Sequence, residues 1–416
     1  MDKFIVEGGY RLKGRVNLSG SKNAALPIMA ATLLTDKECV LNNIPHLNDT
    51  LVMNKLVNIL GGKVSFEGNT VRALNKTIKE FKAPYDLVKT MRASVYVMGA
   101  LLGRYNKAEV AMPGGCIIGE RPINLHLMGF EKLGAKIVIE HGYIKAKAKK
   151  LRGADIYLDT VSVGATANIL MAGIYAQGQT IIRNAAQEPH IVDLCNFLNK
   201  LGARIKGQGT NTITLQGVTS LKGGTYNVIS DYIEAGTFMV ASAITNGKIE
   251  LVNAPLDNIE AVKDNLIDTG SEVKRVKKNL LVKGLAKPRP SKIDTAPYPG
   301  FPTDMQAQWM ALMSVAGGTS IVNETIWEKR FMHVPELNRM GADITTKGNT
   351  AVIKGVKGLS GAPVMVSDLR AGASLVLAGL RAKGTTEISR VYHLDRGYEK
   401  IEKKLEALGA KIRRFK

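Results

Sequence analysis

The chain has 416 residues, 45% of them hydrophobic, which is enough to bury a large core in two or three domains or in one array of repeats. The first residues show no charged segment followed by an apolar one, and no apolar run reaches the ~18 residues that a membrane span needs, so we expect a cytoplasmic protein with no membrane partner. The net charge of +21 attracts polyanions, but the basic residues are dispersed and aromatic residues make up only 6%; this argues against nucleic-acid binding and equally fits small, highly anionic substrates.

The three cysteines, Cys39, Cys116 and Cys195, are too few and too widely spaced for a disulfide framework. Because the cysteines and the six histidines form no C-x-x-C or H-x-x-x-H pair, we predict no metal site, and nothing in the sequence indicates a cofactor. Cys39 in the strand-like CVLNNIP and Cys195 on the apolar face of a helix are expected to be core residues.

A short apolar-glycine step recurs along the chain at intervals of 73, 68, 68, 71 and 68 residues. It reads LGGKV at Leu60, LGAKI at Leu133, LGARI at Leu201, TGSEV at Thr269, MGADI at Met340 and LGAKI at Leu408. This regularity predicts six copies of one supersecondary unit, which divide naturally into two domains of three copies.

Within each copy the predicted elements follow a constant order. Two alternating runs joined by a polar turn, such as 204–215 and 343–354, predict a hairpin of two strands. A helix that is apolar on nearly all faces follows, then a further strand and a more amphipathic helix such as 191–201. The apolar helices are expected near Ala24, Ala93, Ala165, Ala235, Gln306 and Ala371. A helix without a polar face must be buried, so we predict an α/β fold with helices inside and sheets outside.

The two ends of the chain indicate how the copies are grouped. The last anchor, LGAKIRRFK, has no second hairpin strand after it, whereas FIVEGGYRLKG at the N-terminus resembles the second strand AVIKGVKGLSG of the preceding copy. The N-terminal strand is therefore expected to complete the sixth copy. This predicts one domain at residues 20–229 and a second, discontinuous domain at 1–19 plus 230–416.

Polar or charged residues stand directly before each predicted buried helix, where free N–H groups and partial positive charge favour anions. They are Lys22 and Asn23, Arg92, Ser162 to Gly164, Asp231 and Glu234, Asp304, and Asp368 and Arg370. Serine and aspartate are also ordinary helix caps, and for Ser162 and Asp231 capping explains the residue equally well. Three of the others are cations, which destabilise a helix N-terminus, so they indicate an anionic ligand held jointly by side chains and backbone amides.

The segment 112–126, MPGGCIIGERPINLH, places Cys116 in a glycine-rich polar turn with Arg121 five residues beyond. Nearby positive charge lowers the pKa of a cysteine towards neutrality, so that both the thiol and the thiolate are available. Two interpretations are open at this point: a reactive thiol, or a free cysteine that packs as a small hydrophobe.

Ten further motifs follow one another along the chain: SGSKNAALP, DLVKTMRAS, PGGC with GERP, SVGAT, NAAQEPHIVDL, IEAGT, FPTDMQAQ, RFMHVPEL, SDLRA and HLDRGYE. Together they resemble the UDP-N-acetylglucosamine enolpyruvyl transferases, and the match extends from Lys3 to the C-terminus. The resemblance implies two inside-out α/β barrel domains that close on substrate. It also implies transfer of the enolpyruvyl group of phosphoenolpyruvate to the 3′-hydroxyl of UDP-N-acetylglucosamine with release of phosphate, the reaction that begins peptidoglycan precursor synthesis.

The same resemblance implies roles for individual residues. Cys116 would be the proton donor, also able to form a covalent adduct, and Asp304 the base. The residues implied to bind phosphoenolpyruvate are Lys22, Asn23, Arg121, Arg370 and Arg396, with Lys22 and Arg396 also placed in the catalytic set. Those implied to bind the nucleotide sugar are Asn23, Arg92, Arg121, Pro122, Ile123, Asn124, Leu125, Val161, Ser162, Val163, Gly164, Asp304 and Ile326.

Departures from the family pattern lie on the nucleotide side, at Glu120, Asn124, Thr160 and Tyr232, and leave the implied catalytic set intact. Glu120 gives rise to one hypothesis, that its charge raises the Cys116 pKa. Two alternatives to the main interpretation remain: the related enolpyruvyl transferases of the shikimate pathway, whose pattern does not include the PGGC loop, and a basic repeat scaffold without catalysis. The sequence does not predict the oligomeric state.

Overall fold

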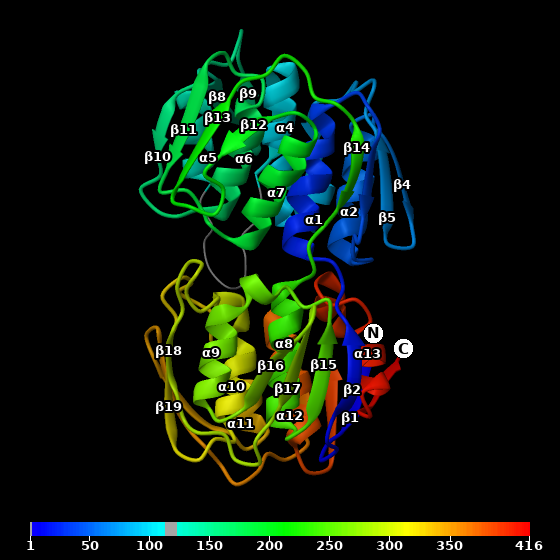
Figure 1. Ribbon diagram of the computed structural model, residues 1–416, viewed down its shortest axis with the longest axis vertical. Helices are drawn as coiled ribbons and strands as arrows, with labels where there is room; N and C mark the ends of the chain where they lie inside the picture. Colours follow the sequence, from blue (N-terminus) through cyan, green and yellow to red (C-terminus); the bar gives the residue numbers. More distant parts are fainter. Residues whose placement is uncertain (1, 113–122) are drawn as a thin grey trace. The chain divides into compact units, whose positions relative to one another are not determined.

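The computed structural model describes residues 2–112 and 123–416, and these divide into two compact units. We call residues 20–112 with 123–229 the first unit and residues 2–19 with 230–416 the second unit. Each unit contains three separate four-stranded sheets (Figure 1).

The sheets of the first unit combine strands from distant parts of its sequence. In spatial order they are β14 (Gly224–Asn227), β3 (Cys39–Asn42), β5 (Thr70–Leu74) and β4 (Lys63–Glu67); β6 (Lys82–Ala83), β7 (Lys107–Ala111), β9 (Tyr143–Lys147) and β8 (Lys136–Glu140); and β10 (Asp155–Tyr157), β11 (Gln179–Arg183), β13 (Thr212–Gln216) and β12 (Arg204–Lys206).

The sheets of the second unit follow the same plan. They are β2 (Lys13–Asn17), β15 (Lys248–Val252), β17 (Asn279–Lys283) and β16 (Glu272–Val276); β18 (Lys292–Asp294), β19 (Thr319–Asn323), β21 (Thr350–Lys354) and β20 (Asp343–Lys347); and β22 (Pro363–Met365), β23 (Thr385–Ser389), β1 (Lys3–Glu7) and β24 (Lys411–Phe415).

All six sheets share one pairing pattern, which confirms the repeat predicted from the anchors. The first strand pairs parallel to the second, and the remaining two pairs are antiparallel, as in β10, β11, β13 and β12. In the last sheet β1 takes the place of the second hairpin strand and pairs antiparallel with both β23 and β24, with Phe4 opposite Ile388 and Arg414. The prediction that the N-terminal strand completes the sixth copy is therefore confirmed.

The anchor glycines have a common backbone role. Each follows one helix and adopts a positive φ, between 89° and 106°, at Gly61, Gly134, Gly202, Gly270, Gly341 and Gly409. Glycine alone reaches this conformation without strain, so it ends the helix and turns the chain into the next strand. The recurrence in the sequence is thus the recurrence of a helix C-terminus.

Three helices lie at the centre of each unit, between its sheets (Figure 1). They are α1 (Lys22–Ala31), α4 (Tyr96–Tyr105) and α6 (Val163–Gly173) in the first unit, and α8 (Tyr232–Ile244), α10 (Gln306–Met313) and α12 (Leu369–Arg381) in the second. Every residue of α8 and α10 is buried, which confirms the prediction of helices inside and sheets outside. Burying a leucine or methionine side chain stabilises a fold by ~1.5–3 kcal/mol, so these helices supply much of the apolar driving force.

The remaining helices cover less of the core and have one polar face. They are α2 (Asn48–Ile59), α5 (Asn124–Lys132), α7 (Pro189–Lys200), α9 (Glu260–Asp268), α11 (Val334–Arg339) and α13 (Ile401–Ala407). Shorter turns of helix are α3 (Tyr85–Val88), η1 (Thr32–Leu34), η2 (Arg92–Val95), η3 (Leu256–Asn258), η4 (Thr303–Met305) and η5 (Val391–Arg396). Cys39 in β3 and Cys195 in α7 are fully buried, as predicted, and burial raises the pKa of each thiol to about 12.

Within the described ranges, none of the helices combines the length and the apolar character that crossing a bilayer requires. The same residues contain no group of three histidine, cysteine or acidic side chains placed to hold a metal ion.

Candidate active site

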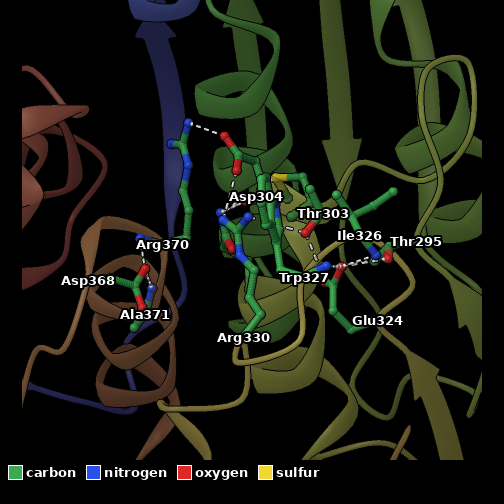
Figure 2. A network of polar contacts seen from close by, with 12 residues as sticks. Thr295, Thr303, Asp304, Glu324, Ile326, Trp327, Arg330, Asp368, Arg370 and Ala371 are labelled. Carbon is green, nitrogen blue, oxygen red and sulfur yellow. Dashed lines mark hydrogen bonds and ion pairs between the residues drawn. The ribbon is translucent and has the colours of Figure 1, made fainter. Parts of the chain in front are cut away.

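The second unit brings together one carboxylate and two guanidinium groups at the N-terminal end of its central helices (Figure 2). Asp304 Oδ1 accepts a hydrogen bond from Arg330 Nη2 at 2.7 Å, and Asp304 Oδ2 accepts one from Arg370 Nη2 at 3.0 Å. The side chain of Asp304 is 28% exposed, whereas those of Arg330 and Arg370 are only 5% and 4% exposed. The cluster therefore presents an accessible carboxylate whose negative charge is paired with two buried guanidinium groups.

Local structure sets the position of Asp304. It is the second residue of η4, directly before α10, and its backbone carbonyl accepts a hydrogen bond from Gln308 Nε2 at 2.9 Å. Gln308 also donates to Tyr398 Oη at 3.2 Å and to Thr237 Oγ1 at 3.3 Å. These buried polar groups connect η4 to α8 and to the segment after η5. They fix the backbone of Asp304 while its carboxylate remains accessible.

Arg370 is the second residue of α12, whose N-terminus is capped by Asp368 Oδ1 through the backbone N–H groups of Arg370 and Ala371. Burial has the largest single effect on the pKa of Arg370 and lowers it, but Asp304, Tyr398 and Asp231 together outweigh burial and the pKa is raised. The Tyr398 ring lies 5.3 Å from the guanidinium carbon.

Two donors of Arg370, Nε and Nη1, have no hydrogen-bond partner among the residues that the structure describes. Buried donors without acceptors cost ~1–3 kcal/mol each, and more when charged. The arrangement therefore suits a site that receives anionic acceptor oxygens.

Arg396 is the last residue of η5 and is half-buried, and η5 packs against α12, which carries Arg370. Burial lowers the pKa of the neighbouring His393, and the positive charge of Arg396 lowers it further. Arg396 thus adds positive charge on η5, which packs against α12, the helix that carries Arg370.

The first unit places its predicted residues at the N-termini of its own central helices. Lys22 opens α1, and its Nζ lies 3.6 Å from Asp49 Oδ2 at the start of α2; both side chains are largely buried. Asn23 follows and is half-buried. The partner carboxylate offsets the cost of a cation at a helix N-terminus, a compensation that the sequence pattern did not predict.

A second cluster in this unit joins Arg92, His126 and Gly164. Asn168 Oδ1 accepts from the Gly99 N–H at 2.9 Å, which fixes its amide orientation, so Asn168 Nδ2 donates to His126 Nδ1 at 2.8 Å. The proton of the neutral imidazole is therefore on Nε2. Burial lowers the His126 pKa to about 4, and the positive charge of Arg92 at the start of η2 contributes further.

The remaining described residues predicted for the nucleotide sugar lie on other parts of the two units. Ser162 caps α6 by accepting from the Ala165 N–H at 3.3 Å, which supports the capping interpretation of Ser162, and Asp231 likewise caps α8. The half-buried side chains of Ile123, Leu125, Val161 and Val163 pack against the core, whereas Asn124, the first residue of α5, is exposed. In the second unit Ile326 is half-buried, and its N–H donates to Glu324 Oε1 at 2.9 Å.

Three predicted site residues, Cys116, Arg121 and Pro122, lie outside the described residues, as does Glu120 with the hypothesis attached to it. Sequence reasoning also assigned no role to Arg330 and His126, although both lie in segments that it singled out, RFMHVPEL and MPGGCIIGERPINLH. The available signal for Arg330 was an arginine next to apolar residues in a connecting segment; only the structure shows it buried against Asp304.

Gly164→Ala is expected to weaken binding of the nucleotide sugar about tenfold. A Cβ at this position would lie 2.9 Å from both Cε1 and Nε2 of His126, so either the imidazole or the start of α6 must move. Isothermal titration with UDP-N-acetylglucosamine measures the change. Gly224→Ala in β14 is the matched control, since its Cβ would meet only Leu201 Cδ2 at 3.8 Å; equal affinities for the two variants would contradict the expectation.

His126→Gln is expected to change the acid stability of the chain. The folded-state pKa of about 4 lies below the unfolded value, so the unfolded state binds the proton first and the stability that neutral His126 contributes is lost as pH falls from about 6.5 to about 4. Glutamine does not titrate, so the free energy of unfolding of the wild type relative to the variant should decrease by up to ~3 kcal/mol over that range.

Urea unfolding of the two proteins at pH 7 and pH 4.5 measures this difference. The comparison must be between proteins, because burial raises the pKa of Asp193 in the same unit to about 6 and its contribution changes with pH in the opposite direction. A difference that does not vary with pH would contradict the assignment of a buried, neutral imidazole.

Comparison with known proteins identifies the class to which this fold and site belong. A family model described as EPSP synthase (3-phosphoshikimate 1-carboxyvinyltransferase) matches residues 6–405, and the chain belongs to this family. Among solved structures, an enolpyruvyl transferase from Streptomyces tendae has a TM-score of 0.90 at 25% identity, covering 100% of this chain and 99% of that one. An EPSP synthase from Acinetobacter baumannii has a TM-score of 0.77 at 18% identity, with 100% of both chains covered, and supports the fold alone.

Curated relatives within the family are closer in sequence. A UDP-N-acetylglucosamine 1-carboxyvinyltransferase from Geobacter metallireducens is 55% identical over 416 residues, covering 100% of both chains. A UDP-N-acetylglucosamine 1-carboxyvinyltransferase 1 from Caldanaerobacter subterraneus subsp. tengcongensis is 55% identical over 412 residues, with 99% of both chains covered.

Proposed function

We propose that this protein is an enzyme that transfers the enolpyruvyl group of phosphoenolpyruvate to the 3′-hydroxyl of UDP-N-acetylglucosamine and releases phosphate. One structural observation carries the proposal: beside the accessible Asp304 carboxylate, the buried Arg370 guanidinium has two donors without a partner in residues 2–112 and 123–416. A reaction between an anionic enol ester and a hydroxyl requires a cationic group that binds the anion and, next to it, a base that takes the hydroxyl proton. The relatives that are 55% identical over the whole chain carry the name of this activity.

The reaction divides into addition and elimination. In the addition, the methylene carbon of phosphoenolpyruvate gains a proton, the sugar oxygen bonds to the adjacent carbon, and the hydroxyl loses its proton. In the elimination, the new methyl group loses a proton, the double bond re-forms and the bond to phosphate breaks. An acid and a base are therefore both needed, and each contributes ~10²–10⁴-fold when positioned.

Asp304 is the proposed base for the hydroxyl proton. Its contacts with Arg330 and Arg370 orient both carboxylate oxygens, and its partial exposure leaves room for a substrate hydroxyl. Cys116 is the proposed acid for the methylene carbon and the proposed site of a covalent adduct. Its assignment rests on the residue type and its sequence context, because it lies outside the described residues.

Phosphoenolpyruvate carries a phosphate and a carboxylate, so its recognition requires several cations. We assign the phosphate to Lys22, Arg121 and Arg396, and the carboxylate to Arg370 and Arg396, with Asn23 beside them. We assign the nucleotide sugar to Arg92, residues 121–125, residues 161–164, Ile326 and the Asp304 carboxylate. Residues 20–229 and residues 1–19 plus 230–416 are proposed as the two enolpyruvyl transferase domains.

The proposed product is a precursor of peptidoglycan, and both proposed substrates are phosphorylated metabolites of the cytoplasm, which is where we place the reaction. Phosphate release from phosphoenolpyruvate tests the proposal, with UDP-N-acetylglucosamine, with shikimate 3-phosphate or with no acceptor. Release that depends on the nucleotide sugar is expected. Release only with shikimate 3-phosphate would favour the shikimate-pathway reaction. No release under any of the three conditions would favour a protein that binds polyanions without catalysis.

A further inference from the structure

Glu324 is a buried carboxylate in the second unit that none of the roles above uses. It follows the last residue of β19, is 1% exposed, and accepts four hydrogen bonds through its two oxygens (Figure 2). Burying a carboxylate destabilises a fold unless its oxygens accept hydrogen bonds. The groups that donate these hydrogen bonds are therefore held in fixed positions. These groups belong to two different parts of the site.

The Oε1 atom of Glu324 organises the turn at residues 324–327. It accepts from the Ile326 N–H at 2.9 Å, from the Trp327 N–H at 3.2 Å and from Thr295 Oγ1 at 2.9 Å. Thr295 Oγ1 in turn accepts from the Thr325 N–H at 2.9 Å, so the threonine hydroxyl is shared between the carboxylate and the backbone of the turn. This side of Glu324 sets the backbone at Ile326, the residue assigned to the nucleotide sugar.

The Oε2 atom of Glu324 leads to the proposed base. It accepts from Thr303 Oγ1 at 2.9 Å, and the same hydroxyl oxygen accepts from Arg330 Nη1 at 3.2 Å. Through its other terminal nitrogen Arg330 donates to Asp304 Oδ1 at 2.7 Å. Since a threonine hydroxyl has one proton, its donation to Glu324 leaves only its lone pairs for Arg330, which fixes the direction of the chain of contacts.

We propose that Glu324 is a positioning residue with two separate effects: Oε1 sets the nucleotide-sugar contact at Ile326, and Oε2, through Thr303 and Arg330, orients the Asp304 carboxylate. The inference rests on the proposed function of the site. It assigns to one buried carboxylate the coordination of substrate binding with the placement of the base, and all the residues involved lie within the second unit.

The two effects can be tested separately because each oxygen has its own threonine. Thr295→Val removes a donor from Oε1 and should raise the KM and the Kd for UDP-N-acetylglucosamine about tenfold while changing kcat less than twofold. Thr303→Val removes the link to Arg330 and should lower kcat about tenfold with little change in that KM. The acid limb of its kcat–pH profile should also move to higher pH, because Arg330 stabilises ionised Asp304 less effectively.

Glu324→Gln should show both effects, since an amide cannot accept all four hydrogen bonds. The serine variants of Thr295 and Thr303 keep the hydroxyl and should restore the wild-type parameters. Glu402→Gln is the matched control, because Glu402 is 7% exposed in the same unit and accepts from Arg414 Nε at 3.2 Å, away from this network. Thermal midpoints of all variants show whether each is folded at the assay temperature.

If Glu324 had a purely structural role, Glu324→Gln would lower the thermal midpoint but have the same kinetic parameters as the Glu402→Gln control. This result would overturn the inference. The same change of KM and kcat in both threonine variants would also overturn it. Isothermal titration of UDP-N-acetylglucosamine gives the affinity independently of turnover. If the wild-type protein released no phosphate, the proposed function itself would be overturned. Failure of this inference and failure of the proposed function are therefore distinguishable.

Discussion

Asp304→Asn is expected to lower kcat about a thousandfold, within the range that a positioned acid or base contributes. The amide has nearly the shape of the carboxylate but cannot take the proton of the sugar hydroxyl. It also turns a donor towards one of the two guanidinium groups that now donate to Asp304, so the contact with Arg330 or with Arg370 is lost. Steady-state phosphate release with both substrates saturating measures the change.

Asp343→Asn is the control for this substitution, because Asp343 is an exposed aspartate at the start of β20 in the same unit. It should leave kcat unchanged. If Asp304→Asn kept more than a tenth of the wild-type turnover, Asp304 would be a substrate contact without a role in proton transfer, and the base would have to be sought elsewhere.

Arg370→Lys is expected to raise the KM for phosphoenolpyruvate about a hundredfold. Lysine keeps the positive charge beside Asp304 but lacks the two further guanidinium donors, Nε and Nη1, that have no partner among the described residues. Two charge-assisted hydrogen bonds at ~1.5–3 kcal/mol each account for a factor of that size even after partial compensation by the ammonium group. Initial rates over a range of phosphoenolpyruvate concentrations give the KM.

Arg381→Lys, at the opposite end of the same helix, controls for the general effect of an arginine-to-lysine change. A thermal unfolding measurement separates loss of binding from loss of fold, since Arg370 is nearly fully buried. An Arg370→Lys protein that is folded and has an unchanged KM for phosphoenolpyruvate would contradict the assignment of these donors to its carboxylate.

The fold could be predicted in considerable detail because its information is local and repeated. The anchor glycines require a positive φ at each helix end, and the six apolar helices have no face that water could cover. Even the pairing of β1 with β24 followed from a missing strand at one end of the chain and an additional one at the other. Each of these features depends on residues within one repeat or at its ends.

The candidate site was predictable by residue type but not by partner. The sequence indicated Lys22 and Arg370 as cations at helix N-termini, but not that Asp49 and Asp304 would pair with them. Arg330 and Glu324 were not predicted as members of the site at all, since their roles come from contacts between η4, the end of β19 and the segment after it. Such contacts depend on how separate elements pack in three dimensions, which neither periodicity nor motif spacing reports.

The most direct test of the central claim is a competition between acceptors. The protein is incubated with limiting phosphoenolpyruvate and equal concentrations of UDP-N-acetylglucosamine and shikimate 3-phosphate, and mass spectrometry identifies which acceptor gains the enolpyruvyl group. We expect the nucleotide sugar alone to gain it, in an amount equal to the phosphate released. Enolpyruvyl shikimate 3-phosphate as the main product, or phosphate released without transfer to either acceptor, would contradict the proposed function.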